Sequence, residues 1–303
     1  MMNPRQVFSR VGFAYAAYLT ISTASQLLAA ALLQPFRARM GEDLWFVVCM
    51  LCMYPAAFLV FWLLMRRIPK DPAGRPDMPL RAGRFLGIFI ICVGVMYAGN
   101  LLGQLISQMA DRLTGRQSVN AVVELVMGMD TWAVFLAAVA AAPVMEELLF
   151  RKLLLDRVSV FGDRTAILLS GVVFGLAHGN FYQFFYAFGL GAIFAWVYLR
   201  TRRIRFSILL HVLINFCGSI LPMQLLHMMR DYPVIGAHLL LGQTMLMMAA
   251  AICGVILLIC QRRDWILLPG SCPIPAGKWF GTVFANKGIL VFFLVSLLFF
   301  FMA

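Results

Sequence analysis

Residues 132–150 read WAVFLAAVAAAPVMEELLF, an apolar stretch that carries two adjacent acids, Glu146 and Glu147. The stretch is long enough to cross a bilayer as a helix. An acid at the centre of such a helix costs about 2.5–3.5 kcal/mol on insertion scales, so buried carboxylates usually mark a functional site. Every other Asp and Glu lies in a connection or at the edge of an apolar segment. The search for chemistry therefore starts at these two acids.

Apolar segments recur along the whole chain. Its 303 residues are 62% hydrophobic, whereas about half of the residues of a typical soluble domain are apolar. None of the segments shows the alternation of a membrane strand, so we expect helices. The sequence predicts an all-α, polytopic membrane helical bundle of about 8–9 transmembrane helices. The nine candidate segments are 11–36, 44–65, 85–108, 132–150, 165–180, 182–199, 206–226, 235–260 and 286–303.

The basic residues alternate between connections. Most of the 25 Lys and Arg residues fall in the N-terminus and in the connections 66–84, 151–164, 200–205 and 262–287. Cytoplasmic loops carry such an excess, so the N-terminus is predicted to be cytoplasmic. This topology accounts for the net charge of +12, and we expect no nucleic-acid partner.

The chain is predicted to be a single transmembrane domain over 1–303, with a catalytic core at 130–225 and flanking helices at 1–110 and 230–303. The compact set of segments, without a targeting extension, favours a multi-pass protein of a bacterial cytoplasmic (inner) membrane.

The two acids point in different directions. Successive helical residues are about 100° apart. Glu147 precedes Arg151 by four positions, the favourable order for a helical ion pair. We therefore expect Arg151 to hold Glu147 ionised, which leaves Glu146 free to face a cavity. The alternative is that both acids extend to the lipid headgroups beside Arg151 and Lys152.

Two further apolar segments carry polar pairs at one-turn spacing. Phe174 and His178 share one helical face, and so do His211 and Asn215. Each pair also has a plain structural interpretation: His178 as a satisfied buried histidine, and His211 with Asn215 as hydrogen-bonding glue between helices.

Together these groups could hydrolyse an amide without a covalent intermediate. A carboxylate can act as a general base toward water. Histidine and asparagine side chains can donate hydrogen bonds to a developing oxyanion in a water-poor site. No serine or cysteine in the sequence is identifiable as a nucleophile paired with a base.

The same residues resemble the CAAX protease and bacteriocin-processing (CPBP, or Abi) family of intramembrane proteases, which includes the type II CAAX prenyl endopeptidases. The family motifs E-E-x-x-x-R, F-x-x-x-H and H-x-x-x-N occur in order, over roughly residues 130–225. The resemblance implies a glutamate-type endopeptidase in which Glu146 activates water, and His178 positions the water or the glutamate. It also implies that His211 and Asn215 form the oxyanion hole. Glu147 is counted with the catalytic residues, and Arg151 and Phe174 support the site.

Two alternatives remain. A zinc peptidase could use Glu146, His178 and His211 as ligands, although no H-E-x-x-H motif is present and no cofactor is favoured. A non-enzymatic scaffold or transporter could also retain the motifs. The expected partners are the lipid bilayer and a peptide or membrane-protein substrate, with or without a lipid anchor.

Overall fold

The fold is a bundle of helices. The computed structural model describes residues 3–71, 78–115 and 120–302, and these residues form helices and connections without a strand. Seven helical stretches are long and apolar enough to cross a membrane, or eight if the bent pair near the C-terminus forms one span. The predicted all-α, multi-pass membrane bundle is therefore confirmed.

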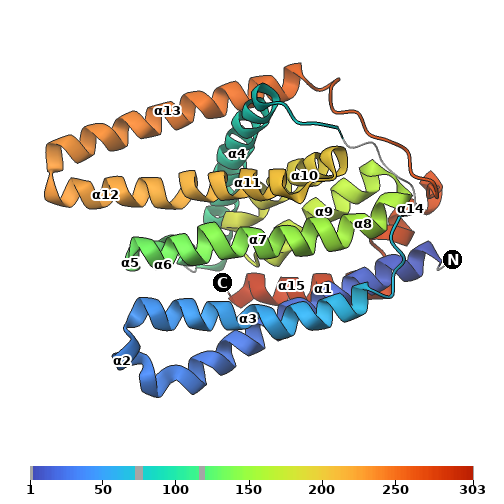
Figure 1. Cartoon of the computed structure of the whole chain (residues 1–303), viewed down its shortest axis with the longest axis horizontal. Helices are drawn as coiled ribbons and strands as arrows, with labels where there is room; N and C mark the ends of the chain where they lie inside the picture. Colours follow the sequence, from blue (N-terminus) through green and yellow to red (C-terminus); the bar gives the residue numbers. More distant parts are fainter. Residues whose placement is uncertain (1–2, 72–77, 116–119, 303) are drawn as a thin grey trace.

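The helices run along the long axis of the molecule, apart from α4, which crosses them steeply (Figure 1). The long elements are α1 (Pro4–Leu33), α3 (Glu42–Met65), α4 (Ala82–Thr114), α10 (Phe181–Thr201) and α13 (Pro233–Cys260). Two further spans are segmented: Thr131–Phe161, and Ile204–Asp231 with α11 (Ile204–Asn215), η5 (Phe216–Ile220) and α12 (Leu221–Asp231). The bent pair is α14 (Ala276–Val283) and α15 (Lys287–Met302), and the shorter elements are η1 (Gln34–Phe36), α2 (Arg37–Met40), α5 (Ala121–Gly128) and α9 (Asp163–Ala177).

The segment 165–180 differs from the predicted span. Its helix, α9, has 15 residues, which at 1.5 Å per residue is about 22 Å and shorter than a hydrocarbon core of about 30 Å. The helix stops because Gly179 adopts a left-handed φ of 66°. Asn180 then caps α10 by accepting a hydrogen bond from the backbone N–H of Gln183 at 2.9 Å. Helices α9 and α10 thus form a tight hairpin.

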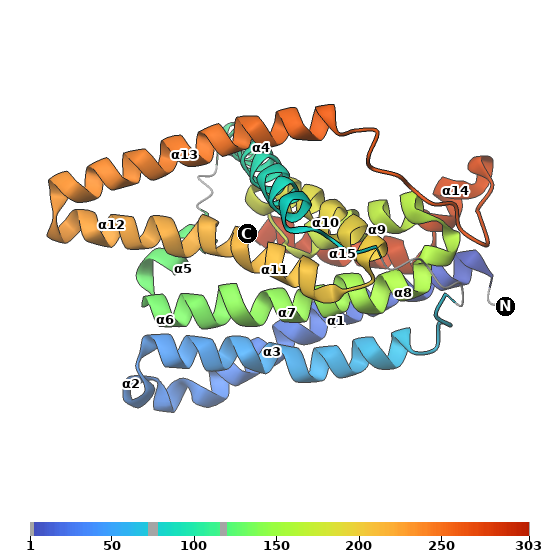
Figure 2. The same cartoon turned by 45° about the horizontal axis from the view of Figure 1, so that its top comes forward.

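The basic connections meet at one end of the bundle. The N-terminus, α8 (Leu154–Val158) and α14 lie at this end, on the right of Figure 1 and of Figure 2. Such clustering is what a positive-inside arrangement requires, although the side of the membrane that this end faces stays a prediction. Hydrogen bonds that tie the connections together run from Met78 N–H to Arg200 O (3.1 Å), Asp163 N–H to Leu268 O (3.0 Å), Asp71 N–H to Asp156 O (2.7 Å) and the Arg5 guanidinium to Ala285 O (3.2 Å).

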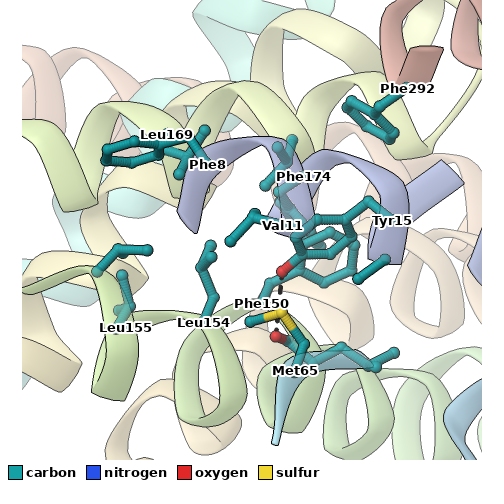
Figure 3. Close-up of a cluster of buried hydrophobic side chains, with 14 of the residues drawn as sticks. Phe8, Val11, Tyr15, Met65, Phe150, Leu154, Leu155, Leu169, Phe174 and Phe292 are labelled. Atoms are coloured by element: carbon teal, nitrogen blue, oxygen red, sulfur yellow. Dashed lines mark hydrogen bonds between the residues drawn. The ribbon is translucent and has the colours of Figure 1, made fainter. Parts of the chain in front are cut away.

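The largest core cluster packs α1 against the glutamate-bearing span. Tyr15 of α1 is fully buried, and its ring stacks on Phe150 at 5.0 Å between centroids (Figure 3). Phe150 in turn contacts Phe174 of α9 edge to face at 5.1 Å. Phe292 of α15 closes the other side of Tyr15 at 5.9 Å. This aromatic cluster fixes the span directly behind the two glutamates.

The glutamate-bearing span becomes π-helical twice. It consists of α6 (Thr131–Val134), the π-helical η2 (Phe135–Ala141), α7 (Ala142–Glu147), the π-helical η3 (Leu148–Leu153), α8 (Leu154–Val158) and η4 (Ser159–Phe161). Side chains of other helices bind carbonyls of η3: the Tyr15 hydroxyl donates to Leu149 O at 3.1 Å, and the Ser170 hydroxyl donates to Phe150 O at 3.0 Å. π-Helical turns are frequent at functional sites. Here they frame the short α-helical stretch that ends at the glutamates.

Replacement of Tyr15 by Phe is expected to lower the free energy of unfolding by about 1–3 kcal/mol, because the buried carbonyl of Leu149 loses its side-chain donor. The measurement is unfolding of the purified protein in mixed micelles. Tyr18, one turn further on, is also buried, and its hydroxyl makes no hydrogen bond to another described residue. Tyr18→Phe is therefore the matched control, with an expected change within about 0.5 kcal/mol. Equal losses in the two variants would contradict this role of Tyr15.

Candidate active site

Glu147 is buried in a cluster of ion pairs. Its Oε2 lies 3.1 Å from Arg151 Nε, and both side chains have no exposed surface. Its Oε1 lies 3.0 Å from Nδ1 of His211. The Arg151 guanidinium also donates to the Ser170 hydroxyl at 3.1 Å. The predicted pairing of Glu147 with Arg151 is thus present, and His211 is a second partner that sequence spacing alone did not reveal.

Glu146 has a different environment. Its side chain keeps 23% of its surface exposed, and its Oε2 lies 3.6 Å from Nε2 of His211. No basic residue of the described chain forms an ion pair with it apart from this histidine. His211 therefore lies between the two carboxylates, with one ring nitrogen directed to each. The arrangement separates a buried, charge-compensated glutamate from one that solvent can reach.

The two histidines meet around Phe174. The Phe174 ring contacts His178 edge to face at 4.8 Å and His211 at 5.7 Å. The guanidinium carbon of Arg151 lies 4.5 Å from the centre of the same ring. His178, His211 and Arg151, which belong to different helical elements, thus all contact the ring of Phe174. His178 and His211 therefore lie close to each other.

The hydrogen bonds of the histidines define their tautomers. Nδ1 of His178 lies 2.8 Å from the carbonyl oxygen of Phe174, which can only accept, so His178 carries its proton on Nδ1. Nδ1 of His211 faces the carboxylate of Glu147, which is paired with Arg151, and donates in the same way. In the neutral form of each ring, Nε2 is then an acceptor.

Asn215 replaces a missing backbone hydrogen bond. Within η2, Ala142 N–H donates to Ala137 O, five residues earlier. The next donor in this pattern is position 143, which is a proline without an N–H. The freed carbonyl of Ala138 instead accepts a hydrogen bond from Nδ2 of Asn215 at 2.8 Å. Asn215 thereby fastens α11 to the span just before the glutamates, and its second amide proton stays available.

Three supporting residues were missed by sequence reasoning. Ser170 and Ser207 are fully buried; the Ser170 hydroxyl accepts from the Arg151 guanidinium at 3.1 Å, and the Ser207 hydroxyl donates to Ile204 O at 3.0 Å. Ser170 stands four residues before Phe174, and Ser207 stands four residues before His211. One-turn spacing was therefore an available signal for both serines. Tyr15 gave no such signal, because it belongs to a helix far away in sequence.

An apolar groove opens beside the site. It lies between α3 and the span that carries Glu146, and its volume is about 570 Å³. Val144 and Met145, which directly precede Glu146, form part of its wall. The remaining lining residues are Leu51, Tyr54, Pro55, Phe58, Leu136, Ala140 and Ala141. An apolar chain could thus approach Glu146 from the membrane.

The described residues contain no group of three or more His, Cys, Asp or Glu side chains that could hold a metal ion. The candidate zinc ligands Glu146, His178 and His211 do lie in one region. A histidine oriented by a carboxylate through Nδ1, as in His211, is also common among zinc ligands. Nε2 of His211 lies 3.6 Å from Oε2 of Glu146.

The fold and the site define a class of protein. It is a multi-pass membrane bundle that holds a partly exposed glutamate, a buried Glu–Arg pair and two histidines together. Residues 128–217 match the family model described as type II CAAX prenyl endopeptidase Rce1-like. This part of the chain is thus similar to that family of membrane proteases, and the resemblance seen in the three motifs is confirmed.

Two bacterial relatives agree with this assignment. YdiL of Bacillus subtilis (strain 168), named as a membrane peptidase, is 25% identical over 198 residues, which cover 61% of this chain and 73% of YdiL. The membrane-embedded CAAX protease MroQ of Staphylococcus aureus (strain USA300) is 34% identical over 92 residues, 28% of this chain and 36% of MroQ. The chain matches no solved structure.

Proposed function

We propose that the protein is a glutamate-type intramembrane endopeptidase, in which Glu146 activates water for attack on a peptide bond. The observation that carries the proposal is the division between the two glutamates. Glu147 is buried and paired with Arg151, whereas Glu146 is partly exposed and 3.6 Å from His211. Only Glu146 combines access to water with a basic partner, as a general base requires.

In the proposed reaction, Glu146 takes a proton from a water molecule, and the resulting hydroxide attacks the carbonyl carbon of the substrate. Nε2 of His178 accepts a hydrogen bond from the O–H group that the water keeps, and so holds the water in place. The developing oxyanion accepts hydrogen bonds from His211 and from the second amide proton of Asn215. Glu146 then returns its proton to the leaving amine when the C–N bond breaks.

His211 can donate to the oxyanion only when both ring nitrogens carry protons, because Nδ1–H already faces Glu147. Each ring nitrogen of His211 faces a carboxylate oxygen, of Glu147 at 3.0 Å and of Glu146 at 3.6 Å. The proposed role of Glu147 is to support this doubly protonated form, and the role of Arg151 is to keep Glu147 ionised.

The proposed substrate is a peptide or membrane-protein segment, with or without a lipid anchor, that reaches Glu146 through the apolar groove. The relatives are bacterial proteins, which supports a place in a bacterial cytoplasmic membrane. If the predicted topology holds, the basic end of the bundle faces the cytoplasm.

Activity of the purified protein is expected to survive thorough metal removal, because the proposed steps need no metal ion. The measurement is cleavage of a substrate peptide in detergent before and after treatment with a chelator, followed by re-addition of Zn²⁺. An unrelated zinc protease in the same detergent provides the control for complete stripping. Loss on chelation with recovery on added Zn²⁺ would overturn the glutamate mechanism in favour of the zinc alternative.

A further inference from the structure

A small cavity at the basic end of the bundle is separate from the glutamate site. Its volume is about 60 Å³. It lies where α4 begins, where α10 ends and beside the connection that follows α13. The lining residues that carry charge or an indole ring are Arg84, Trp196, Arg200 and Asp264. The ends of two helices and the connections beside them therefore enclose the cavity at the expected border between hydrocarbon and water.

Two guanidinium groups gather on one indole ring in this cavity. The guanidinium carbons of Arg84 and Arg200 lie 5.6 and 5.9 Å from the Trp196 ring centre. Trp265 packs on the same indole at 4.5 Å. The two tryptophans form one apolar wall of the cavity. Cation–π contacts with Trp196 hold the guanidinium groups of Arg84 and Arg200 beside this wall.

The two arginines differ in their remaining hydrogen-bonding capacity. Arg200 connects α10 to two neighbouring segments by hydrogen bonds. Its Nη2 donates to Ile266 O at 2.8 Å, and its backbone carbonyl accepts from Met78 N–H at 3.1 Å. Arg84 makes no hydrogen bond or ion pair within the described parts of the chain, and its contact is the Trp196 ring. Its fork of donors is open to a ligand.

We propose that this cavity binds a phosphate group at the membrane surface, with Arg84 as the principal ligand and Arg200 as the second. A planar guanidinium matches the oxygens of a phosphate bidentately. Basic pockets between transmembrane helices are suited to acidic lipid headgroups. Asp264 lines the same cavity and opposes an anion, but its single carboxylate leaves the two arginines in excess. The phosphate can come from a phospholipid headgroup or from a soluble phosphate compound.

The test is native mass spectrometry of the full-length protein in detergent, titrated with phosphatidylglycerol or with diacylglycerol, which lacks the phosphate. Wild type is expected to bind phosphatidylglycerol at least about tenfold more tightly, and Arg84→Gln is expected to remove this preference. Arg81→Gln is the matched control. Arg81 lies one helical turn before Arg84 but does not line the cavity, so this substitution removes the same charge without changing the proposed site. Asp264→Asn is expected to tighten binding.

Competition distinguishes the two sources of phosphate. Displacement of phosphatidylglycerol by glycerol phosphate at constant ionic strength indicates a site for soluble phosphate compounds, and its absence indicates a lipid site. Equal losses in Arg84→Gln and Arg81→Gln would show that only diffuse surface charge attracts the lipid, and would overturn the proposal. So would equal binding of the two lipids by the wild type. None of these readouts depends on proteolysis.

Discussion

Replacement of Glu146 by Gln is expected to reduce peptide-bond hydrolysis by about 10²–10⁴-fold, the usual contribution of a general base. The amide keeps the size of the side chain but cannot take a proton from water. The bundle should remain folded, because Glu146 is partly exposed and forms no ion pair with Arg or Lys in the described residues. The variant therefore separates chemistry from stability.

The measurement compares membranes that hold equal amounts of wild type and Glu146→Gln. Uncleaved precursors should accumulate with the variant, and their identities would reveal the substrate. Glu124→Gln is the control, since Glu124 is an exposed acid on α5, remote in sequence from the three motifs. Unchanged processing with a folded Glu146→Gln protein would refute the protease proposal and leave the scaffold or transporter as the explanation.

Replacement of Arg151 by Met is expected to lower the free energy of unfolding by about 3–5 kcal/mol, the largest stability effect predicted for this chain. The methionine fills similar space but leaves Glu147 ionised and buried without its main counter-charge. A second substitution, Glu147→Gln, removes that charge. The double variant should therefore recover most of the lost stability, while hydrolysis stays impaired because Nδ1 of His211 no longer faces a carboxylate.

Unfolding in mixed micelles measures these differences, with Lys152→Met as the control. Lys152 is adjacent in sequence and pairs with Asp156 at 3.1 Å, but 43% of its side-chain surface is exposed. Asp156 is only 5% exposed, but it keeps Arg202 at 3.4 Å and the Tyr198 hydroxyl at 2.6 Å as partners, so the control should lose less stability than Arg151→Met. If the double variant were no more stable than Arg151→Met alone, the unpaired charge of Glu147 would not be the cause of the loss.

Much of the fold follows from composition, because a membrane forces each apolar segment to satisfy its backbone within a helix. The segment 165–180 shows the limit of that reasoning. Its hydropathy resembles that of a span, yet the helix stops at Ala177 because Gly179 turns the chain and Asn180 starts α10. The His-Gly-Asn sequence at 178–180 indicates the end of one helix and the start of the next. An average hydropathy over the segment does not detect it.

The sequence predicts which site residues share a face of one helix, but not which residues of different helices contact each other. Spacing of four residues placed Glu147 with Arg151, as the structure has it. Two contacts between helices are visible only in the structure. His211 lies between the two glutamates, and Asn215 donates a hydrogen bond to the carbonyl of Ala138. The catalytic roles of these residues stay predictions until the variants are measured.

The π-helical turns have a consequence for comparing this chain with its relatives. A π turn closes its hydrogen bond over one residue more than an α turn, so it absorbs an inserted residue within one turn of the helix. Segments η2 and η3 stand on either side of α7. A relative that is one residue shorter in 135–141 or 148–153 can therefore present the same glutamates in the same orientation. Alignments of this span should place single-residue gaps in those two turns, and should leave the stretch between them unbroken.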